Sequence, residues 1–339
     1  MAQQTSDAYA DSWLSELDLE TLPGPYKGSG WINVMQGLGR PVNLPLMVAR
    51  GATAGPTVMA IAGVHGNEYE GMAAIRRVFV DLNPDQMRGT FIGIPMANPF
   101  AFDARSRVAP GDVDGLNLAR IFPGALPGTP SQELAHHLLG FIRRHIGSGD
   151  LLIDFHSGSH DAAFATVVGI RDIDSPGRAA AERAARHFGL TDLWLIDDSS
   201  GPLNATTSRL GIPTIGTETV GRSGCDPAGA ASFTQGLRNI LALYGILMNA
   251  PQAPEAPGIF RPATTLFATC SGLIEEAAQL YQHVEQGQTL GTIVDIFGNE
   301  LDHIIAPNSG TIWTARTNPA VRTGEILFMI AYPDQDTDP

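Results

Sequence analysis

The sequence predicts an α/β fold: a mixed, mainly parallel sheet with helices on both faces, followed by a small all-β domain. Two observations carry this prediction. Short apolar runs alternate with segments of helical periodicity up to about residue 247, whereas strand-like runs alone follow residue 262. Several runs of the first part are apolar throughout, as expected for strands that are buried on both faces of a parallel sheet.

Strands and helices are expected to alternate along the first part of the chain. Strand composition is found at 57–64, 90–97, 151–157, 165–170 and 213–220. Helical patterns cover 68–80, 131–146, 176–188 and 227–247. For the helix at 176–188, Ser175 is the expected N-cap, Pro176 the first helical residue and Gly189 the C-terminal stop. Residues 1–25 are expected to form a polar arm and a helix that ends at Pro23-Gly24-Pro25.

A Pro-rich segment divides the chain. We expect an α/β domain over residues 1–250, a linker over 251–262 and a β domain over 263–339. In the β domain, short strand-like runs are separated by turn residues. These runs are 273–280, 289–297, 303–307, 310–316 and 326–332.

Composition narrows the possible partners and the cellular location. The 339 residues carry a net charge of −14, which argues against nucleic acid or an anionic membrane as partner. Only two Cys occur, so a disulfide framework is excluded. The chain shows no signal-peptide pattern and no apolar run of about 18–20 residues. We therefore expect a cytoplasmic protein, and the low charged fraction of 17% leaves a homo-oligomer open.

The segment AGVHGNEYEG contains the sharpest chemical signal. Its His65 and Glu68 are expected to flank the turn between a strand that ends at Val64 and a helix that begins near Glu68. Imidazole and carboxylate are good Zn²⁺ ligands, and a catalytic zinc takes three protein ligands. The expected third ligand is His156, which lies at the end of another buried strand with Asp154 placed to orient it. An isolated HxxE pair is common in proteins without metal, so the prediction depends on both segments together.

A metal-assisted hydrolase also needs a base and a cation. Glu218 ends a third apolar run, before a Gly-rich loop, and is the expected base; its structural alternative is an ion pair with Arg222. The expected cations are Arg105, Arg107 and Arg120, which lie in a long Gly- and Pro-containing loop.

These motifs, in this order, resemble the succinylglutamate desuccinylase/aspartoacylase family. The motifs are H-G-N-E, then N-P…R…P…D-G-x-N-L-x-R-x-F-P-G, then D-x-H-S-G, then a strand that ends in T-E. The resemblance covers about residues 30–335. It implies a zinc carboxypeptidase-like core, a C-terminal β domain that caps the site, and zinc-dependent hydrolysis of the amide bond of a small N-acyl amino acid.

The resemblance also implies roles for single residues. It implies one Zn²⁺ per chain, held by His65, Glu68 and His156. It implies that Glu218 is the base that activates the metal-bound water and that Arg107 polarises the scissile carbonyl group.

One position in the motif that the resemblance assigns to substrate binding departs from the family. Arg120 matches the arginine of an Asn–Arg pair that binds the substrate carboxylate, but the preceding residue is Ala119 instead of Asn. Asn117 and Arg105 complete the predicted substrate-binding set. The missing amide predicts a substrate that is bulkier at this point or lacks an α-carboxylate there; the alternative is that a nearby residue such as Asn117 takes over its role.

Two other functions remain open at this stage. A zinc carboxypeptidase would use the same core and metal, and an open groove would favour it. A non-catalytic binding protein would keep the fold, although an intact ligand set and base argue against it. The donor set also accepts Co²⁺ or Mn²⁺.

Overall fold

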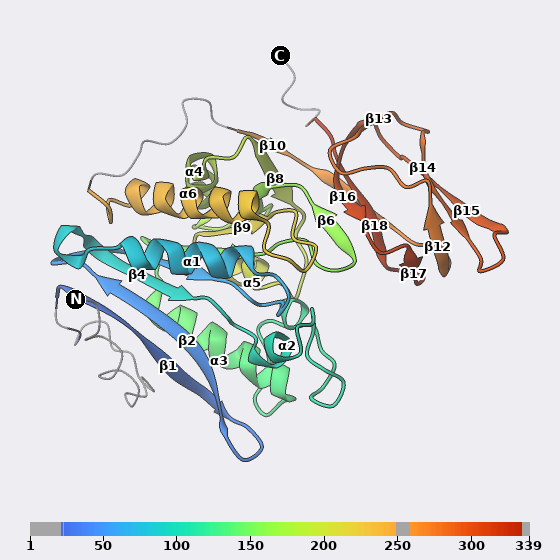
Figure 1. Ribbon diagram of the computed structural model, residues 1–339. Coiled ribbons are helices and arrows are strands. Elements are labelled where there is room, and N and C mark those ends of the chain that lie inside the picture. Colours follow the sequence, from blue (N-terminus) through green and yellow to red (C-terminus); the bar gives the residue numbers. More distant parts are fainter. Residues whose placement is uncertain (1–21, 23, 249–257, 334–339) are drawn as a thin grey trace.

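The computed structural model describes residue 22, residues 24–248 and residues 258–333. It confirms the predicted fold class: a nine-stranded mixed sheet lies between helices, and a smaller unit of antiparallel strands follows (Figure 1). The expected N-terminal arm and helix and most of the Pro-rich segment lie outside the described residues. Within those residues, no helix is long and apolar enough to cross a membrane.

The large sheet is parallel over its four central strands, and this centre pairs antiparallel with the strand on either side of it. Its strands are, in spatial order, β1 (Tyr26–Gln36), β2 (Pro41–Arg50), β4 (Arg88–Ile94), β3 (Thr53–Ile61), β5 (Leu151–Phe155), β9 (Thr214–Glu218), β7 (Val167–Arg171), β8 (Asp192–Ile196) and β10 (Ile259–Arg261). The four strands from β4 to β9 run parallel to one another. β1 and β2 form an antiparallel hairpin that the sequence analysis did not predict.

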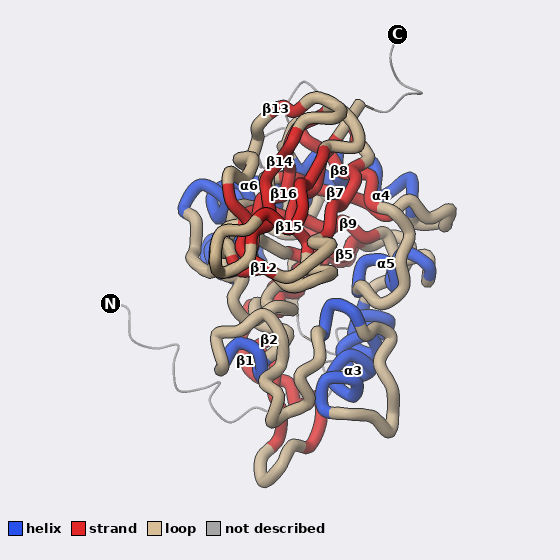
Figure 2. The backbone as a smooth tube through the Cα atoms, turned by 90° about the vertical axis from the view of Figure 1, so that its right-hand side faces the viewer, coloured by secondary structure: helices blue, strands red, loops and turns tan. Residues whose placement is uncertain are grey.

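Helices cover both faces of this sheet because each face is apolar (Figures 1 and 2). One face packs against α1 (Glu70–Asp81), α4 (Arg178–Phe188) and α6 (Pro227–Leu243). The other face packs against α3 (Pro130–His145) and α5 (Leu203–Arg209). The short helices α2 (Pro99–Asp103), η1 (Pro84–Gln86) and η2 (Leu118–Arg120) lie in the connections.

Two helices begin later than the sequence predicts. α1 begins at Glu70, so Glu68 lies in the turn before the helix. α4 begins at Arg178 after Gly177, and the Ser175 carbonyl accepts a hydrogen bond from the Arg178 amide in the preceding turn. Ser175 is therefore not the N-cap. Gly189 ends α4 as predicted, with a φ of 106° that favours glycine.

The C-terminal unit contains two antiparallel sheets. One has the order β11 (Ala263–Phe267), β18 (Ile326–Ala331), β16 (Gly310–Arg316) and β13 (His283–Val284). The other has the order β15 (Glu300–Ile305), β14 (Thr289–Val294), β12 (Gly272–Glu275) and β17 (Ala320–Val321). Of the expected strand at 273–280, only the first three residues belong to β12.

The two units are joined by backbone pairing. β6 (Ala162–Phe164), which follows His156, pairs with β16, and Trp313 packs against Ala165 and Val167. β10 lies in the expected linker but pairs with β8 in the large sheet. The C-terminal unit thus contacts the segment that follows His156, while its capping of the site stays a prediction.

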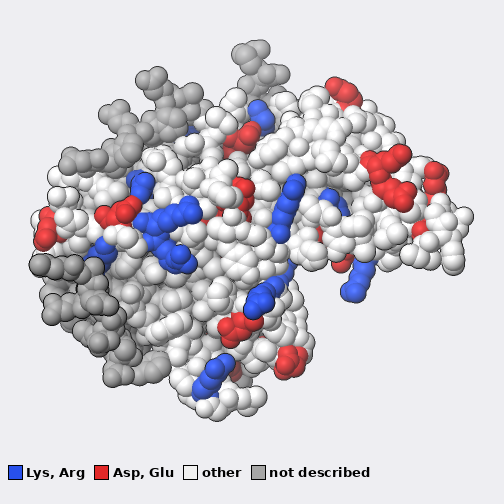
Figure 3. All heavy atoms as spheres, viewed as in Figure 1, with Lys and Arg blue, Asp and Glu red and all other residues white. Residues whose placement is uncertain are grey.

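The surface charge is uneven despite the net charge of −14. On the face shown in Figure 3, basic side chains gather over the layer of α1 and α6, and acidic side chains predominate over the C-terminal unit. Arg76, Arg77 and Arg238 line a hollow of about 620 Å³ between these two helices. On this face, the basic side chains are therefore concentrated over α1 and α6.

Candidate active site

Three adjacent parallel strands bring the predicted residues to one edge of the sheet. His65 follows β3, His156 follows β5, and Glu218 is the last residue of β9. The register pairs Ile61 with Asp154 across β3 and β5. Because parallel strands end at the same edge, residues distant in sequence meet there.

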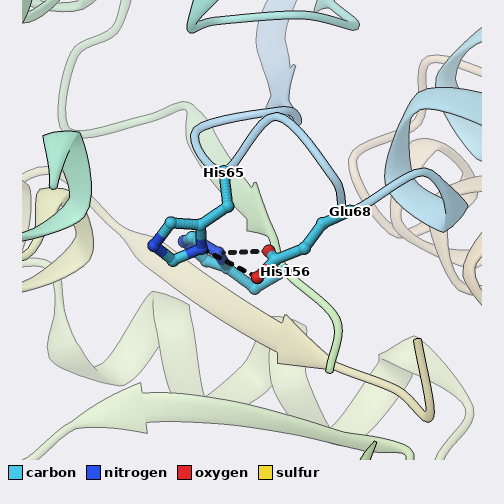
Figure 4. A group of neighbouring side chains, drawn as sticks. All are labelled: His65, Glu68 and His156. Atoms are coloured by element: carbon cyan, nitrogen blue, oxygen red, sulfur yellow. Dashed lines mark hydrogen bonds and ion pairs between the residues drawn. The ribbon is translucent and has the colours of Figure 1, made fainter. Parts of the chain in front are cut away.

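His65, Glu68 and His156 form one compact cluster (Figure 4). One ligand atom from each residue lies within 4.8 Å of the others. His65 Nδ1 lies 2.8 Å from Glu68 Oε1, and His156 Nδ1 lies 2.9 Å from Glu68 Oε2. His65 and Glu68 are buried, and His156 is nearly so. Each carboxylate oxygen therefore faces one imidazole.

Charge and burial act differently on the three groups. Burial, assisted by the Arg107 charge, lowers the pKa of His65 to about 4, so this imidazole is neutral at pH 7. Burial alone would raise the pKa of Glu68, but the two histidines outweigh it and hold that pKa well below its usual range. Burial likewise opposes protonation of His156, but Asp154 and Glu68 raise its pKa well above the ordinary value. The metal-free site thus contains a protonated His156 beside an ionised Glu68.

Each histidine has a second polar partner. His65 Nε2 lies 3.1 Å from Asn117 Oδ1, which also accepts a hydrogen bond from the Ala119 amide. Because that oxygen is an acceptor, His65 Nε2 is the protonated nitrogen and Nδ1 keeps its lone pair. His156 Nε2 lies 3.4 Å from Asp154 Oδ1, as the predicted orienting role requires. Both Nδ1 atoms are thereby directed toward Glu68.

This cluster has the properties of a site for a divalent cation. Two nitrogens and two oxygens converge, and the buried His65 Nδ1 has no hydrogen-bond partner among the residues that the structure describes, although it lies beside Glu68. Two imidazoles and one carboxylate form a common catalytic zinc ligand set. The residues present therefore fit the predicted metal.

Arg107 and Glu218 lie beside the cluster. Arg107 Nη1 donates a hydrogen bond of 2.6 Å to Glu68 Oε1. Glu218 is buried at its Oε2 atom, which has no hydrogen-bond partner among the described residues. Burial and the Glu68 charge raise its pKa to about 8. The alternative ion pair between Glu218 and Arg222 is absent from the part of the chain that the structure describes.

The predicted substrate-binding residues do not all behave alike. Partial burial and the neighbouring Arg107 charge lower the pKa of the Arg120 guanidinium, which interacts electrostatically with Glu218 and so lies near the site. The Asn117 side-chain oxygen contacts His65. Asn117 therefore has a contact within the protein in addition to its predicted role in substrate binding. Arg105 is exposed, with a φ of 52°, and makes no side-chain hydrogen bond or ion pair with any described residue.

Ala119, which precedes Arg120, is 5% exposed and belongs to the apolar cluster on the α3 face of the sheet. The effect of this position on substrate specificity stays a prediction.

Two polar side chains at the site were missed. Glu70 is completely buried and accepts a hydrogen bond from Ser157 Oγ. Asn67 Nδ2 donates to Ser223 Oγ, which lies in the loop after Glu218. The signal for both was their position within the HGNEYEG segment, two residues from a predicted metal ligand.

Comparisons with known proteins show which proteins this chain resembles. Residues 54–244 match the model of the succinylglutamate desuccinylase/aspartoacylase catalytic domain. A curated relative, the N-alpha-acetyl-L-2,4-diaminobutyric acid deacetylase of Halomonas elongata, is 28% identical over 301 residues, covering 86% of each chain.

Solved structures extend the similarity to nearly the whole chain. The product-bound ectoine utilization protein EutE (DoeB) from Ruegeria pomeroyi has a TM-score of 0.81 at 25% identity, covering 92% of this chain and 98% of that one. A succinylglutamate desuccinylase/aspartoacylase from Rhodobacter sphaeroides has a TM-score of 0.79 at 26% identity, covering 91% and 96%. Since the family model matches more than half of its residues, the chain belongs to the succinylglutamate desuccinylase/aspartoacylase family.

Proposed function

We propose that the protein is a zinc-dependent amidohydrolase that removes the acyl group from a small N-acyl amino acid. The observation that carries the proposal is the convergence of His65, Glu68 and His156 within 4.8 Å. Arg107 and Glu218, whose Oε2 atom is buried, lie beside that cluster, and the family membership supports deacylation as the reaction.

The three clustered residues would hold one zinc ion per chain. When bound, zinc supplies a Lewis acid and lowers the pKa of a coordinated water toward about 7. Asn117 and Asp154 orient the two imidazoles through their Nε2 atoms. His156 would have to lose a ring proton to serve as a ligand, so metal binding would release a proton.

Glu218 and Arg107 have the two proposed catalytic roles that the metal does not supply. Glu218 accepts a proton from the attacking water at its carboxylate and then passes that proton to the leaving amine. Glu218 must be ionised to accept that proton; its pKa of about 8 belongs to the metal-free chain, and the positive charge of a bound cation would lower it. Arg107 donates hydrogen bonds to the amide oxygen as negative charge develops there.

The substrate class is inferred from the relatives and from Arg120. The name of the curated relative identifies it as a deacetylase of an N-acetylated amino acid. We therefore propose an N-acetyl amino acid as substrate here, with Arg120 binding its carboxylate.

A substrate screen with metal-loaded protein tests the proposal. The panel contains N-acetyl amino acids, including N-alpha-acetyl-2,4-diaminobutyrate, together with N-succinylglutamate and unblocked dipeptides. Release of amine from an N-acyl compound, lost on chelation and restored by Zn²⁺, is the expected result. Preferential cleavage of dipeptides would indicate a carboxypeptidase, and zinc binding without hydrolysis would indicate a binding protein.

A further inference from the structure

Glu70 is a completely buried carboxylate with no part in the proposed reaction. Its Oε2 atom accepts a hydrogen bond of 2.7 Å from Ser157 Oγ. Its Oε1 atom accepts one of 2.8 Å from the backbone amide of Asp226. Both oxygens are therefore engaged, which is what a buried carboxylate requires.

The two hydrogen bonds connect segments that carry the site. Ser157 follows His156, and its backbone amide donates to Glu68 Oε2 at 3.2 Å. Asp226 caps α6 and ends the loop that begins after Glu218. These partners lie 87 and 156 positions from Glu70 in the sequence. Glu70 thus links the first turn of α1 to the end of β5 and to the loop after β9.

We propose that Glu70 is a positioning residue for the metal centre. By holding Ser157, it fixes the point at which His156 leaves β5 relative to Glu68, two residues before Glu70. By holding Asp226, it fixes the far end of the loop that follows Glu218. The inference rests on the proposed function, because what is positioned is the set of three metal ligands.

A simpler role for Glu70 is stabilisation of the α1 dipole, since acids are favourable in the first turn of a helix. Glu133 provides the comparison: it lies in the first turn of α3, stays partly exposed, and accepts only a 3.3 Å hydrogen bond from the Gly128 amide. A dipole interaction requires neither burial nor two distant partners. The burial of Glu70 and its two bonds therefore point to positioning.

Four variants separate the two roles: Glu70→Ala, Glu70→Gln, Ser157→Ala and the control Glu133→Ala. In Glu70→Gln the amide oxygen can accept from Asp226 and the amide nitrogen can donate to the Ser157 hydroxyl, so both links survive without the charge. The zinc dissociation constant is measured by competition with a chelating dye, and thermal unfolding is measured on the same metal-free samples.

Positioning predicts that Glu70→Ala weakens zinc binding by about tenfold or more, and Ser157→Ala severalfold. Glu70→Gln and Glu133→Ala should stay within about threefold of wild type. A dipole role instead predicts that both Glu70 variants lower the melting temperature alike and leave zinc affinity unchanged.

Zinc affinity within threefold of wild type in Glu70→Ala, or equal losses in Glu70→Gln and Glu70→Ala, would overturn the inference. If Glu70→Ala does not fold, Ser157→Ala decides, and an unchanged affinity there overturns it too. Failure of wild-type protein to bind zinc would instead refute the proposed function on which the inference rests.

Discussion

Glu68 is the residue on which the geometry of the site depends. Its carboxylate faces His65 and His156 through separate oxygens and also accepts a hydrogen bond from Arg107. A buried carboxylate in contact with three nitrogen-bearing side chains and one backbone amide stays ionised, which is the state that a metal ligand requires. The turn before α1 allows this, because it leaves Glu68 outside the helix and close to His65.

Glu218 has a different environment from Glu68, and this difference assigns their roles. Glu218→Gln keeps the shape of the side chain and removes its basicity. We expect the variant to bind zinc normally and to lose at least ~10²-fold in kcat, because an amide cannot take up the proton that the carboxylate accepts. Metal analysis and steady-state kinetics on the same preparation check this. Near-normal kcat with zinc bound would exclude Glu218 as the base.

The raised pKa of Glu218 also predicts how the stability of the metal-free protein depends on pH. In the folded chain this pKa is about 8, whereas in the unfolded chain it returns to about 4.5. Protonated Glu218 therefore contributes its full stabilisation below about pH 4.5, and that contribution is lost as the pH rises through about 8.

Melting temperatures of the chelated wild type and of Glu218→Gln, compared from pH 5 to pH 8, measure this effect. The wild type should lose stability relative to the variant as the pH rises. Parallel curves for the two proteins would show that Glu218 is not protonated in the folded metal-free state.

At the scale of elements, close packing against the backbone of residue 158 determines the conformation of the loop after β9. Gly221 has a φ of 68°, and a Cβ atom there would lie 1.6 Å from the Gly158 carbonyl oxygen. Arg222 and Ser223 also have positive φ values, of 65° and 54°. This strained loop connects Glu218 to α6 and contacts the segment that follows His156.

Gly221→Ala should therefore disturb both catalytic segments. We expect a fall in the free energy of unfolding of more than about 1 kcal/mol, with a loss of kcat, because the collision adds to the cost of the positive φ. Gly224→Ala is the matched control, since the nearest atom to a Cβ there lies 3.8 Å away. Denaturant unfolding checks the comparison, and equal stabilities for the two variants would contradict this account of the loop.

The sequence was most informative where buried strands end. The runs at 57–64, 151–157 and 213–220 contain most or all of β3, β5 and β9. They were predictable because a short, continuous apolar run that is bounded by polar residues is typical of a buried strand. The β1–β2 hairpin was missed although Val42, Leu44, Leu46 and Val48 alternate with more exposed residues along β2. That alternation was the available signal.

What local sequence could not provide was the pairing of distant segments. The hydrogen bonds of Glu70 to residues 157 and 226 arise only after the sheet has formed. The burial of Ala119 depends likewise on packing against the α3 layer, which a motif comparison alone does not predict. Helix starts were also displaced, since Ser175 forms a turn instead of a cap.

At the scale of the whole molecule, the family fold explains why the site lies where it does. The parallel centre of the nine-stranded sheet brings three strand ends together, and the C-terminal unit contacts the segment after His156 through β6 and β16. Family membership establishes the deacylase framework, and the side chains at the strand ends carry the proposed chemistry.

The central claim is that His65, Glu68 and His156 hold one catalytic zinc ion per chain. Zinc content per chain, measured after dialysis against a weak chelator, tests it most directly when wild type is compared with His65→Ala, His156→Ala and the exposed-residue control His136→Ala. The account predicts one equivalent in wild type and in the control, and less than a tenth of an equivalent in the two site variants, which should also be inactive. A full equivalent of tightly bound zinc in either site variant would contradict it.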